Sequence, residues 1–183
     1  MLKKNIRVLL ASALFIVGAP VSAEWDEKKM AEKIDNLVSQ MTLEEKASMT
    51  SGRDAWSTQP IERLDIPYIW MADGPHGLRR APTTYFWGYG DQAPATCFPT
   101  ASALSATWDM DLLDEVGRAL GVESNALGVD LLLGPGINIK RSPLAGRNFE
   151  YFSEDPILSG KLGAAYINGV QSQGVGATAK HYV

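Results

Sequence analysis

The sequence has very little cysteine, and this scarcity limits the classes of protein that it can encode. Cys97 is the single cysteine among 183 residues, so no disulfide can form within the chain. Small secreted scaffolds that depend on several disulfides are therefore excluded. We expect Cys97 to be a small buried apolar residue, with a catalytic thiol as the alternative.

The patterns of the common cofactor and metal sites are also missing. No grouping of histidine, cysteine and aspartate has the spacing of a zinc site. Gly134-Pro135-Gly136 lacks the third glycine of a dinucleotide-binding fingerprint. We therefore expect neither a cofactor nor a metal.

Residues 1–23 have the features of a secretory signal peptide. Three cations near the start precede an apolar run over 8–19, a proline and the small residues 21–23. The run is shorter than the roughly 20 residues that span a bilayer. We predict cleavage after residue 23 and export to the periplasm or the extracellular space, without membrane association afterwards. A retained N-terminal anchor is the alternative.

The chain also has few positive charges relative to its acids. Removal of residues 1–23, which hold three cations and no acids, takes the formal net charge from −4 to −7. Such a surface argues against nucleic acid or an anionic membrane as a partner. No feature of the sequence indicates an oligomeric state.

The remaining residues alternate between helical and extended patterns, which predicts parallel βαβ units. We expect a helical pair over 24–49, strands at 67–72, 129–133 and from 175 onward, and helices within 100–127 and 156–173. Thr42 and Glu45 form a capping box, Asp109 or Thr107 is a candidate cap, and Ser153 is expected to cap the last helix. The predicted fold class is α/β: roughly the first three parallel strands, with their helices, of a TIM-like (β/α)₈ barrel. Since a complete barrel takes roughly 250 residues, residues 24–183 are predicted to be its truncated N-terminal portion.

Two segments that follow predicted strands carry reactive side chains. Asp73-Gly74-Pro75-His76-Gly77 follows the first strand, where α/β folds place functional groups. A plain turn is the alternative. The long loop over 134–156 follows the second strand and combines three cations with three aromatics, a mixture suited to a polar ring such as a sugar. We expect those aromatics mainly to pack the loop.

A further aromatic cluster occupies the segment between the first strand and the next helix. Its members are Tyr85, Phe86, Trp87 and Tyr89. Because no spacing directs them to one point, we expect them to seal a loop against the domain rather than to stack on a ligand.

With Asp73-Gly-Pro-His-Gly, Gly146-Arg-Asn-Phe-Glu and Lys180-His181 in this order, the chain resembles the N-terminal part of a family 3 glycoside hydrolase, and the β-glucosidase branch most closely. The resemblance implies retaining hydrolysis of terminal, non-reducing β-D-glucosyl residues, with a β-linked oligosaccharide or glucoside as substrate. It also implies that Asp73, Arg147, Lys180 and His181 bind the sugar, with Arg79 as a weaker candidate. The nucleophile and the acid/base residue are expected beyond residue 183, so no catalytic residue is assigned and the fragment is predicted to be inactive.

Several alternatives remain open from the sequence. Arg147 could simply pair with Glu150, and His181 could be a buried histidine at a strand end. The full-length parent could instead be a β-xylosidase or a β-N-acetylglucosaminidase. The chain could also be an inactive carbohydrate-binding or interaction module. Cooperative unfolding together with glucose binding by the isolated chain would favour that last alternative.

Overall fold

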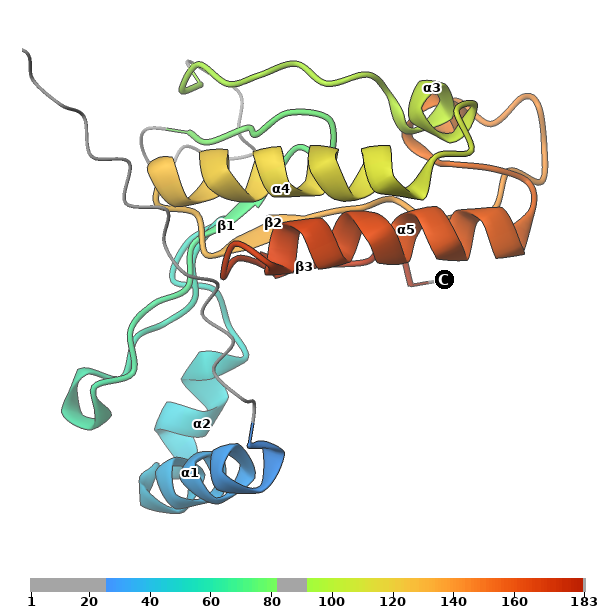
Figure 1. The fold of residues 1–183 in the computed structure, drawn as a ribbon. Coiled ribbons are helices and arrows are strands. Elements are labelled where there is room, and N and C mark those ends of the chain that lie inside the picture. The colour runs from blue at the N-terminus through green and yellow to red at the C-terminus, as the bar shows by residue number, and fades with distance from the viewer. Residues whose placement is uncertain (1–25, 82–91, 183) are drawn as a thin grey trace, which may run out of the picture. The chain divides into compact units, whose positions relative to one another are not determined.

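The computed structural model describes residues 26–81 and 92–182 and has the α/β architecture that the sequence predicts (Figure 1). The helices are α1 (Glu27–Gln40), α2 (Leu43–Met49), α3 (Ala101–Ser105), α4 (Met110–Ala126) and α5 (Pro156–Gln171), with 3₁₀ turns η1 (Glu62–Leu64) and η3 (Asn148–Glu150). The strands are β1 (Met71–Asp73), β2 (Leu131–Leu133) and β3 (Gly176–Ala177). The aromatic cluster at 85–89 and the predicted signal peptide lie outside the described residues.

The chain divides into two compact units, with the boundary between Ser39 and Gln40. In the first, α1 buries none of its residues, and Ile34 and Val38 of its predicted apolar face are exposed. In the second, α2 begins with the predicted capping box: Thr42 Oγ1 accepts from the Glu45 amide at 3.1 Å, and Glu45 Oε2 accepts from the Thr42 amide at 2.9 Å. The sheet and the candidate site belong entirely to this second unit.

The three strands form one parallel sheet in the order β1-β2-β3. Ala72 pairs with Leu132, and Leu132 pairs in turn with Ala177. The strands are shorter than predicted. β2 starts only at Leu131 because the amide of Val129 still bonds to the α4 carbonyl of Ser124, and the carboxylate of Asp130 accepts from the amide of Trp70.

One predicted helix cap is confirmed and another is wrong. The helical stretch predicted within 100–127 is broken at Trp108, which has a φ of 56° and separates α3 from α4. Asp109, the first of the two candidate caps, caps α4 by accepting from the Leu112 amide at 3.0 Å. The predicted cap Ser153 was wrong for α5: Asp155 Oδ1 accepts from the amide of Ile157 at 2.7 Å, directly before Pro156.

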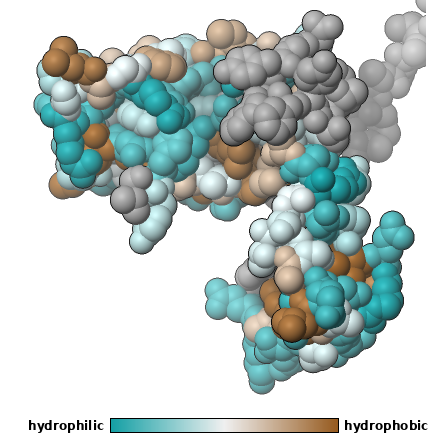
Figure 2. All heavy atoms as spheres, turned by 180° about the vertical axis from the view of Figure 1, so that it is seen from behind, coloured by the Kyte–Doolittle hydropathy of each residue, from teal (hydrophilic) through white to brown (hydrophobic). Residues whose placement is uncertain are grey.

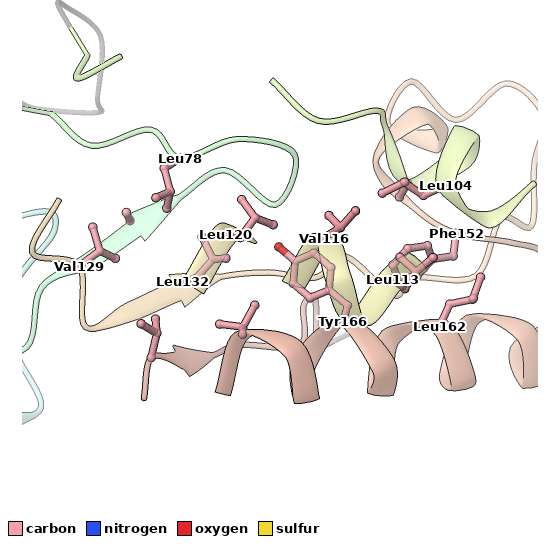
Figure 3. Close-up of a cluster of buried hydrophobic side chains, with 14 of the residues drawn as sticks. Leu78, Leu104, Leu113, Val116, Leu120, Val129, Leu132, Phe152, Leu162 and Tyr166 are labelled. Carbon is pink, nitrogen blue, oxygen red and sulfur yellow. The ribbon is translucent and has the colours of Figure 1, made fainter. Parts of the chain in front are cut away.

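A core of buried apolar side chains lies between the sheet and helices α4 and α5 (Figure 3). Its fully buried members include Leu113, Leu120, Leu132, Leu162, Tyr166 and Val170. Burying one such side chain stabilises a fold by roughly 1.5–3 kcal/mol. Tyr166 also donates a hydrogen bond from its hydroxyl to the carbonyl of Pro75 at 3.1 Å, and its burial raises the pKa of the phenol. Through this hydrogen bond, a buried core residue contacts the loop that follows β1.

Cys97 is exposed, so the prediction of a buried cysteine was wrong. The residue lies in the extended segment before α3, from which the neighbouring Phe98, and not Cys97, packs against the core. Apolar side chains also reach the surface elsewhere, and Figure 2 shows them in several separate places on the face that it presents. Scattered exposure of this kind is normal for a folded protein.

Helices α4 and α5 pack closely through a pair of glycines. A Cβ atom at Gly169 would lie 2.2 Å from the carbonyl oxygen of Asp114, and one at Gly117 would lie 2.3 Å from that of Tyr166. Both distances are far below van der Waals contact with backbone atoms, which cannot move aside independently. The absence of side chains at these two positions sets the distance between the helices.

We predict that Gly169→Ala lowers the free energy of unfolding by about 1–3 kcal/mol, because the added methyl group forces α4 and α5 apart. Gly160→Ala is the matched control, since a Cβ at that position of α5 meets nothing within 4 Å. Removing a helical glycine there should stabilise the fold by up to about 1 kcal/mol. Denaturant unfolding of both variants measures the contrast, and equal effects would contradict this account of the interface.

Candidate functional site

Asp73 is the last residue of β1, and the turn after it needs a glycine. Gly74 has a φ of +115°, and a Cβ there would lie 1.9 Å from the carbonyl oxygen of Gly77. The turn is closed by the amide of Arg79, which donates to the carbonyl of Asp73 at 2.9 Å. The motif is therefore a turn, and this turn leaves the Asp73 carboxylate at the C-terminal edge of the sheet.

Lys180 reaches the same edge from the end of β3. Its backbone bonds to Pro135 and Ile137, which follow β2, and this pairing continues the sheet beyond the strands. The Lys180 ammonium lies 2.8 Å from Asp73 Oδ1 and 3.4 Å from Glu150 Oε1. Its side chain is only 15% exposed, so the ammonium is held between two carboxylates in a largely desolvated position.

Glu150 also binds Arg147. Arg147 precedes η3 and Glu150 ends it, and this turn brings Arg147 Nη2 to 2.6 Å and Nε to 2.7 Å from Glu150 Oε2. The ion pair that the sequence left as an alternative thus exists, and the hydrogen bond to Glu150 raises the pKa of Arg147. The Arg147 side chain nevertheless remains 55% exposed, which leaves its other donors available.

His181 lies beside Arg147 and is tied to the loop after β2. Its Nε2 atom is 3.1 Å from Arg147 Nη2, and its backbone amide donates to Asn138 Oδ1 at 2.8 Å. Burial lowers the pKa of His181, and the nearby charges of Arg147 and Lys180 lower it further. Both effects favour the neutral imidazole over the imidazolium ion.

Arg79 occupies the outer side of Asp73. Its Nη1 atom is 3.4 Å from Asp73 Oδ2, and its side chain is half exposed. The charges along the site then alternate in sign from Arg79 through Asp73, Lys180 and Glu150 to Arg147. Burial alone raises the pKa of Asp73, but the hydrogen bond and the charge of Lys180 outweigh it, and the pKa lies below its usual range.

An open cavity of about 330 Å³ lies over these groups. Its lining consists of Asp73, Gly74, Pro75, His76, Gly77, Arg79, Arg147, Phe149 and Glu150. The volume falls within the range of about 300–1,000 Å³ that is usual for small-molecule sites. The five residues predicted from the sequence therefore come together: three line the cavity, and Lys180 and His181 bind residues of its wall.

Four further residues of this region were not singled out as site residues. Glu150 anchors two cations, Asn138 and Tyr151 contact the His181 ring, and His76 accepts a hydrogen bond at Nε2 from the Ala101 amide at 2.9 Å. Burial lowers the pKa of His76. The sequence does indicate the contact of Glu150 with Arg147, because residues three positions apart can pair within one helical turn. No such spacing indicates the contact of Asn138, since its partner lies 43 positions away.

The aromatics of the 134–156 loop divide between two roles. Phe152 is buried in the core, as expected, whereas Phe149 is 54% exposed and lines the cavity. The expectation that these side chains mainly pack the loop was thus wrong for Phe149, because the turn of η3 directs it outward. An exposed aromatic ring beside fixed polar groups is suited to contact with a sugar ring.

Within residues 26–81 and 92–182, no cluster of three or more histidine, cysteine or acidic side chains has a geometry that could hold a metal ion. Over the same part of the chain, no helix has both the length and the apolar character needed to cross a bilayer.

The chain is similar in sequence to a known protein family and to characterised members of it. The model of the glycosyl hydrolase family 3 N-terminal domain matches residues 20–183. The sequence is 58% identical over 154 residues, or 84% of the chain, to thermostable β-glucosidase B of Acetivibrio thermocellus. It is 48% identical over 155 residues to an exo-α-(1→6)-L-arabinopyranosidase of Bifidobacterium longum. In both cases the match spans 20% of the relative, so the chain corresponds to one fifth of their length.

Solved structures give the same result for the fold. β-Glucosidase 3B of Thermotoga neapolitana, determined in complex with glucose, superposes with a TM-score of 0.74 at 43% identity, over 81% of this chain and 23% of that one. A β-glucosidase of Kluyveromyces marxianus, also in complex with glucose, gives a TM-score of 0.76 at 40% identity, over 81% and 17% of the two chains. The three-stranded sheet with its helices is thus the beginning of a TIM-like barrel.

We predict that Lys180→Met lowers the free energy of unfolding by about 1–3 kcal/mol at pH 7, because it leaves two neighbouring carboxylates without their shared cation. This is less than the roughly 3–5 kcal/mol for breaking a fully buried pair, since the Asp73 side chain is 29% exposed. Arg118→Met is the control: it removes an exposed pair with Asp114 on α4 and should cost about 0.5 kcal/mol or less.

The pH dependence of this difference has a defined sign. The folded state lowers the pKa of Asp73, so its pairing stabilises the fold above the unfolded pKa of about 3.9 and is lost as the pH falls through the folded value. The difference between the wild type and Lys180→Met should therefore be full at pH 7 and shrink below about pH 4. A difference that grows on acidification would contradict the assignment. Denaturant unfolding at several pH values measures it.

Proposed function

The chain belongs to glycosyl hydrolase family 3, and on that premise we propose that it supplies the sugar-binding part of a β-glucosidase-like active site. The observation that carries the proposal is the convergence of Asp73, Arg147, Lys180 and His181 at one edge of the sheet, although Asp73 and Lys180 are 107 positions apart. Relatives named as β-glucosidases, two of them solved with glucose, support the substrate class.

The chemistry of the site suits a sugar that carries several hydroxyl groups. The Asp73 carboxylate only accepts hydrogen bonds, so it takes the protons of neighbouring hydroxyls. The guanidinium of Arg147 and the ammonium of Lys180 only donate, so they bind hydroxyl oxygens in fixed directions. Because Glu150 already holds both cations in place, little conformational entropy is lost when the sugar binds.

Such contacts favour the transition state of glycoside hydrolysis. The sugar ring flattens as it gains oxocarbenium character, and hydrogen bonds to its hydroxyls strengthen at that point. Retaining hydrolysis also needs two carboxyl groups about 5–5.5 Å apart, one as nucleophile and one as acid/base. We assign neither role to Asp73 or Glu150, because each is engaged by cations that suit it to binding or anchoring. We propose that the two catalytic carboxyl groups come from sequence that follows residue 183 in a longer enzyme.

The preferred glycoside is proposed to be a terminal, non-reducing β-D-glucoside. A specific observation favours testing a second substrate: the relative with 48% identity is named as an exo-α-(1→6)-L-arabinopyranosidase. A panel of aryl glycosides that includes β-D-glucoside, α-L-arabinopyranoside, β-D-xyloside and N-acetyl-β-D-glucosaminide distinguishes these specificities. We further propose that residues 1–23 direct export, so that the enzyme meets its substrate in the periplasm or outside the cell.

We predict that the chain extended by its downstream sequence hydrolyses aryl β-D-glucosides and that residues 1–183 alone do not. The physical reason is that the two catalytic carboxyl groups are absent from the shorter chain. Release of the chromogenic aglycone measures both forms. Absence of hydrolysis of every β-linked substrate by the extended enzyme would overturn the proposed activity. Hydrolysis by residues 1–183 that Asp73→Asn abolishes would overturn the division of roles.

In the extended enzyme, we predict that Asp73→Asn lowers kcat/KM for the glucoside by roughly 10- to 150-fold, which corresponds to about 1.5–3 kcal/mol for a hydrogen bond to a charged group. Asp114→Asn is a closely matched control, because the Asp114 side chain is 28% exposed and that of Asp73 is 29% exposed. Asp114 lies on α4, where its carboxylate accepts a hydrogen bond from Nε of Arg118 on the same helix, and it does not line the cavity. Its variant should keep kcat/KM within about twofold of the wild type, since surface substitutions usually change little.

A further inference from the structure

The His181 ring is held by a side chain from a distant part of the sequence. Asn138 follows β2 in an extended segment, and the amide of its neighbour Ile137 donates to the carbonyl of Lys180 at 2.7 Å. This backbone pairing places Asn138 Oδ1 2.8 Å from the His181 amide nitrogen and 3.0 Å from the ring atom Nδ1. One oxygen therefore contacts both the backbone and the ring of the same residue.

These contacts determine which ring nitrogen carries the proton. A backbone amide can only donate, so the Asn138 atom that faces it must be the amide oxygen and not the amide nitrogen. An oxygen of this kind can only accept, and Nδ1 must therefore be the protonated nitrogen of the neutral ring. The opposite side of the ring gives the same answer independently: Arg147 Nη2, 3.1 Å from Nε2, can only donate, so Nε2 must be the acceptor.

We infer that Asn138 is a positioning residue that fixes His181 in the Nδ1–H tautomer, so that Nε2 is presented to the site as a hydrogen-bond acceptor. In the other tautomer, an Nε2–H group would face the N–H group of Arg147, and two donors at 3.1 Å would repel each other. The tautomer is thus what allows Arg147 and His181 to lie side by side. Because Nε2 has one lone pair, which accepts from Arg147, a sugar hydroxyl that binds there must donate its proton and take the place of the Arg147 donor.

The surrounding charges favour the neutral form of the ring, which is the form that has two tautomers. Arg147 and Lys180 face the ring as cations, while Glu150 and Asp73 oppose them from farther along the site. Tyr151 is the other neighbour of Nδ1, with its hydroxyl 3.3 Å away and its ring edge-on to the imidazole. Because a hydroxyl can donate or accept, Tyr151 adapts to either tautomer and does not select one.

The experiment measures the ¹⁵N chemical shifts of the imidazole nitrogens, which differ strongly between protonated and unprotonated atoms. His76 and His181 are the only histidines of the chain, so the spectrum is simple. His76 serves as an internal marker of folding, since its Nε2 accepts from the Ala101 amide and it should also show the Nδ1–H pattern. In the wild type at pH 7, we expect both histidines to have a protonated Nδ1 and an unprotonated Nε2.

Three variants then isolate the role of Asn138. Asn138→Leu removes one of the two groups that select the tautomer, and because Arg147 still disfavours Nε2–H, the two His181 signals should move part of the way toward an average of both tautomers. Asn138→Asp keeps an acceptor oxygen beside the ring, and because its carboxylate favours the imidazolium ion, it should in either charge state retain a protonated Nδ1. Tyr151→Phe removes the other partner of Nδ1 and should leave the tautomer unchanged. An unchanged His181 pattern in Asn138→Leu, with His76 still showing its folded signature, would overturn the inference, as would loss of the pattern in Tyr151→Phe.

The consequence for the sugar rests on the proposed function and is measured separately in the extended enzyme. Asn138→Leu should weaken glucoside binding, seen as a KM raised by roughly 5- to 10-fold, the equivalent of one hydrogen bond of about 1 kcal/mol. If the spectrum of the isolated chain lacks the His76 pattern that marks the folded state, the comparison of KM between the wild type and Asn138→Leu becomes the test of the inference. An active enzyme with unchanged kinetics in Asn138→Leu would contradict the inference. A shifted tautomer in a protein that hydrolyses no glycoside would support the positioning role and overturn the proposed function instead.

Discussion

The candidate site depends on one interaction, the placement of the Lys180 ammonium between the carboxylates of Asp73 and Glu150. Without this cation, two acidic side chains would share a poorly solvated edge of the sheet and repel each other. With it, the site becomes a chain of alternating charges that ends in Arg147. Each charged group is held by an opposite neighbour, and Asp73, Arg79, Arg147 and Glu150 also line the cavity. The same contacts that stabilise the fold therefore also prepare the site for a polar ligand.

The parallel sheet makes this interaction possible. Asp73 ends β1, the loop after β2 carries Arg147 and Glu150, and Lys180 follows β3, so the chain delivers all of them to one edge. Tyr166 of the core also contacts this edge, because its hydroxyl donates a hydrogen bond to the carbonyl of Pro75. Close packing of α4 and α5 at Gly117 and Gly169 keeps the helix that carries Tyr166 in position. A change in the helix interface is therefore expected to reach the site through this hydrogen bond.

Much of this arrangement could be predicted from sequence, because it follows from local patterns and strand order. The α/β class, the Thr42 capping box and the position of Asp73 at a strand end all depend on residues that are near one another in the chain. The exposure of Cys97 and Phe149 could not be predicted, since it depends on where an irregular segment runs. The roles of Asn138 and His76 were also missed, because their hydrogen-bond partners are 43 and 25 positions away and no repeating pattern connects them.

The central claim is that the edge formed by Asp73, Lys180, Glu150 and Arg147 binds a sugar. A titration of the ¹⁵N-labelled extended enzyme with methyl β-D-glucoside tests this claim most directly. The backbone amide signals report where the sugar binds. The account predicts saturable shifts at Gly74, Arg147 and His181 and none at Arg118 on the outer side of α4. Saturable shifts confined to other regions, or no shifts at any glucoside concentration in a folded and active enzyme, would contradict it.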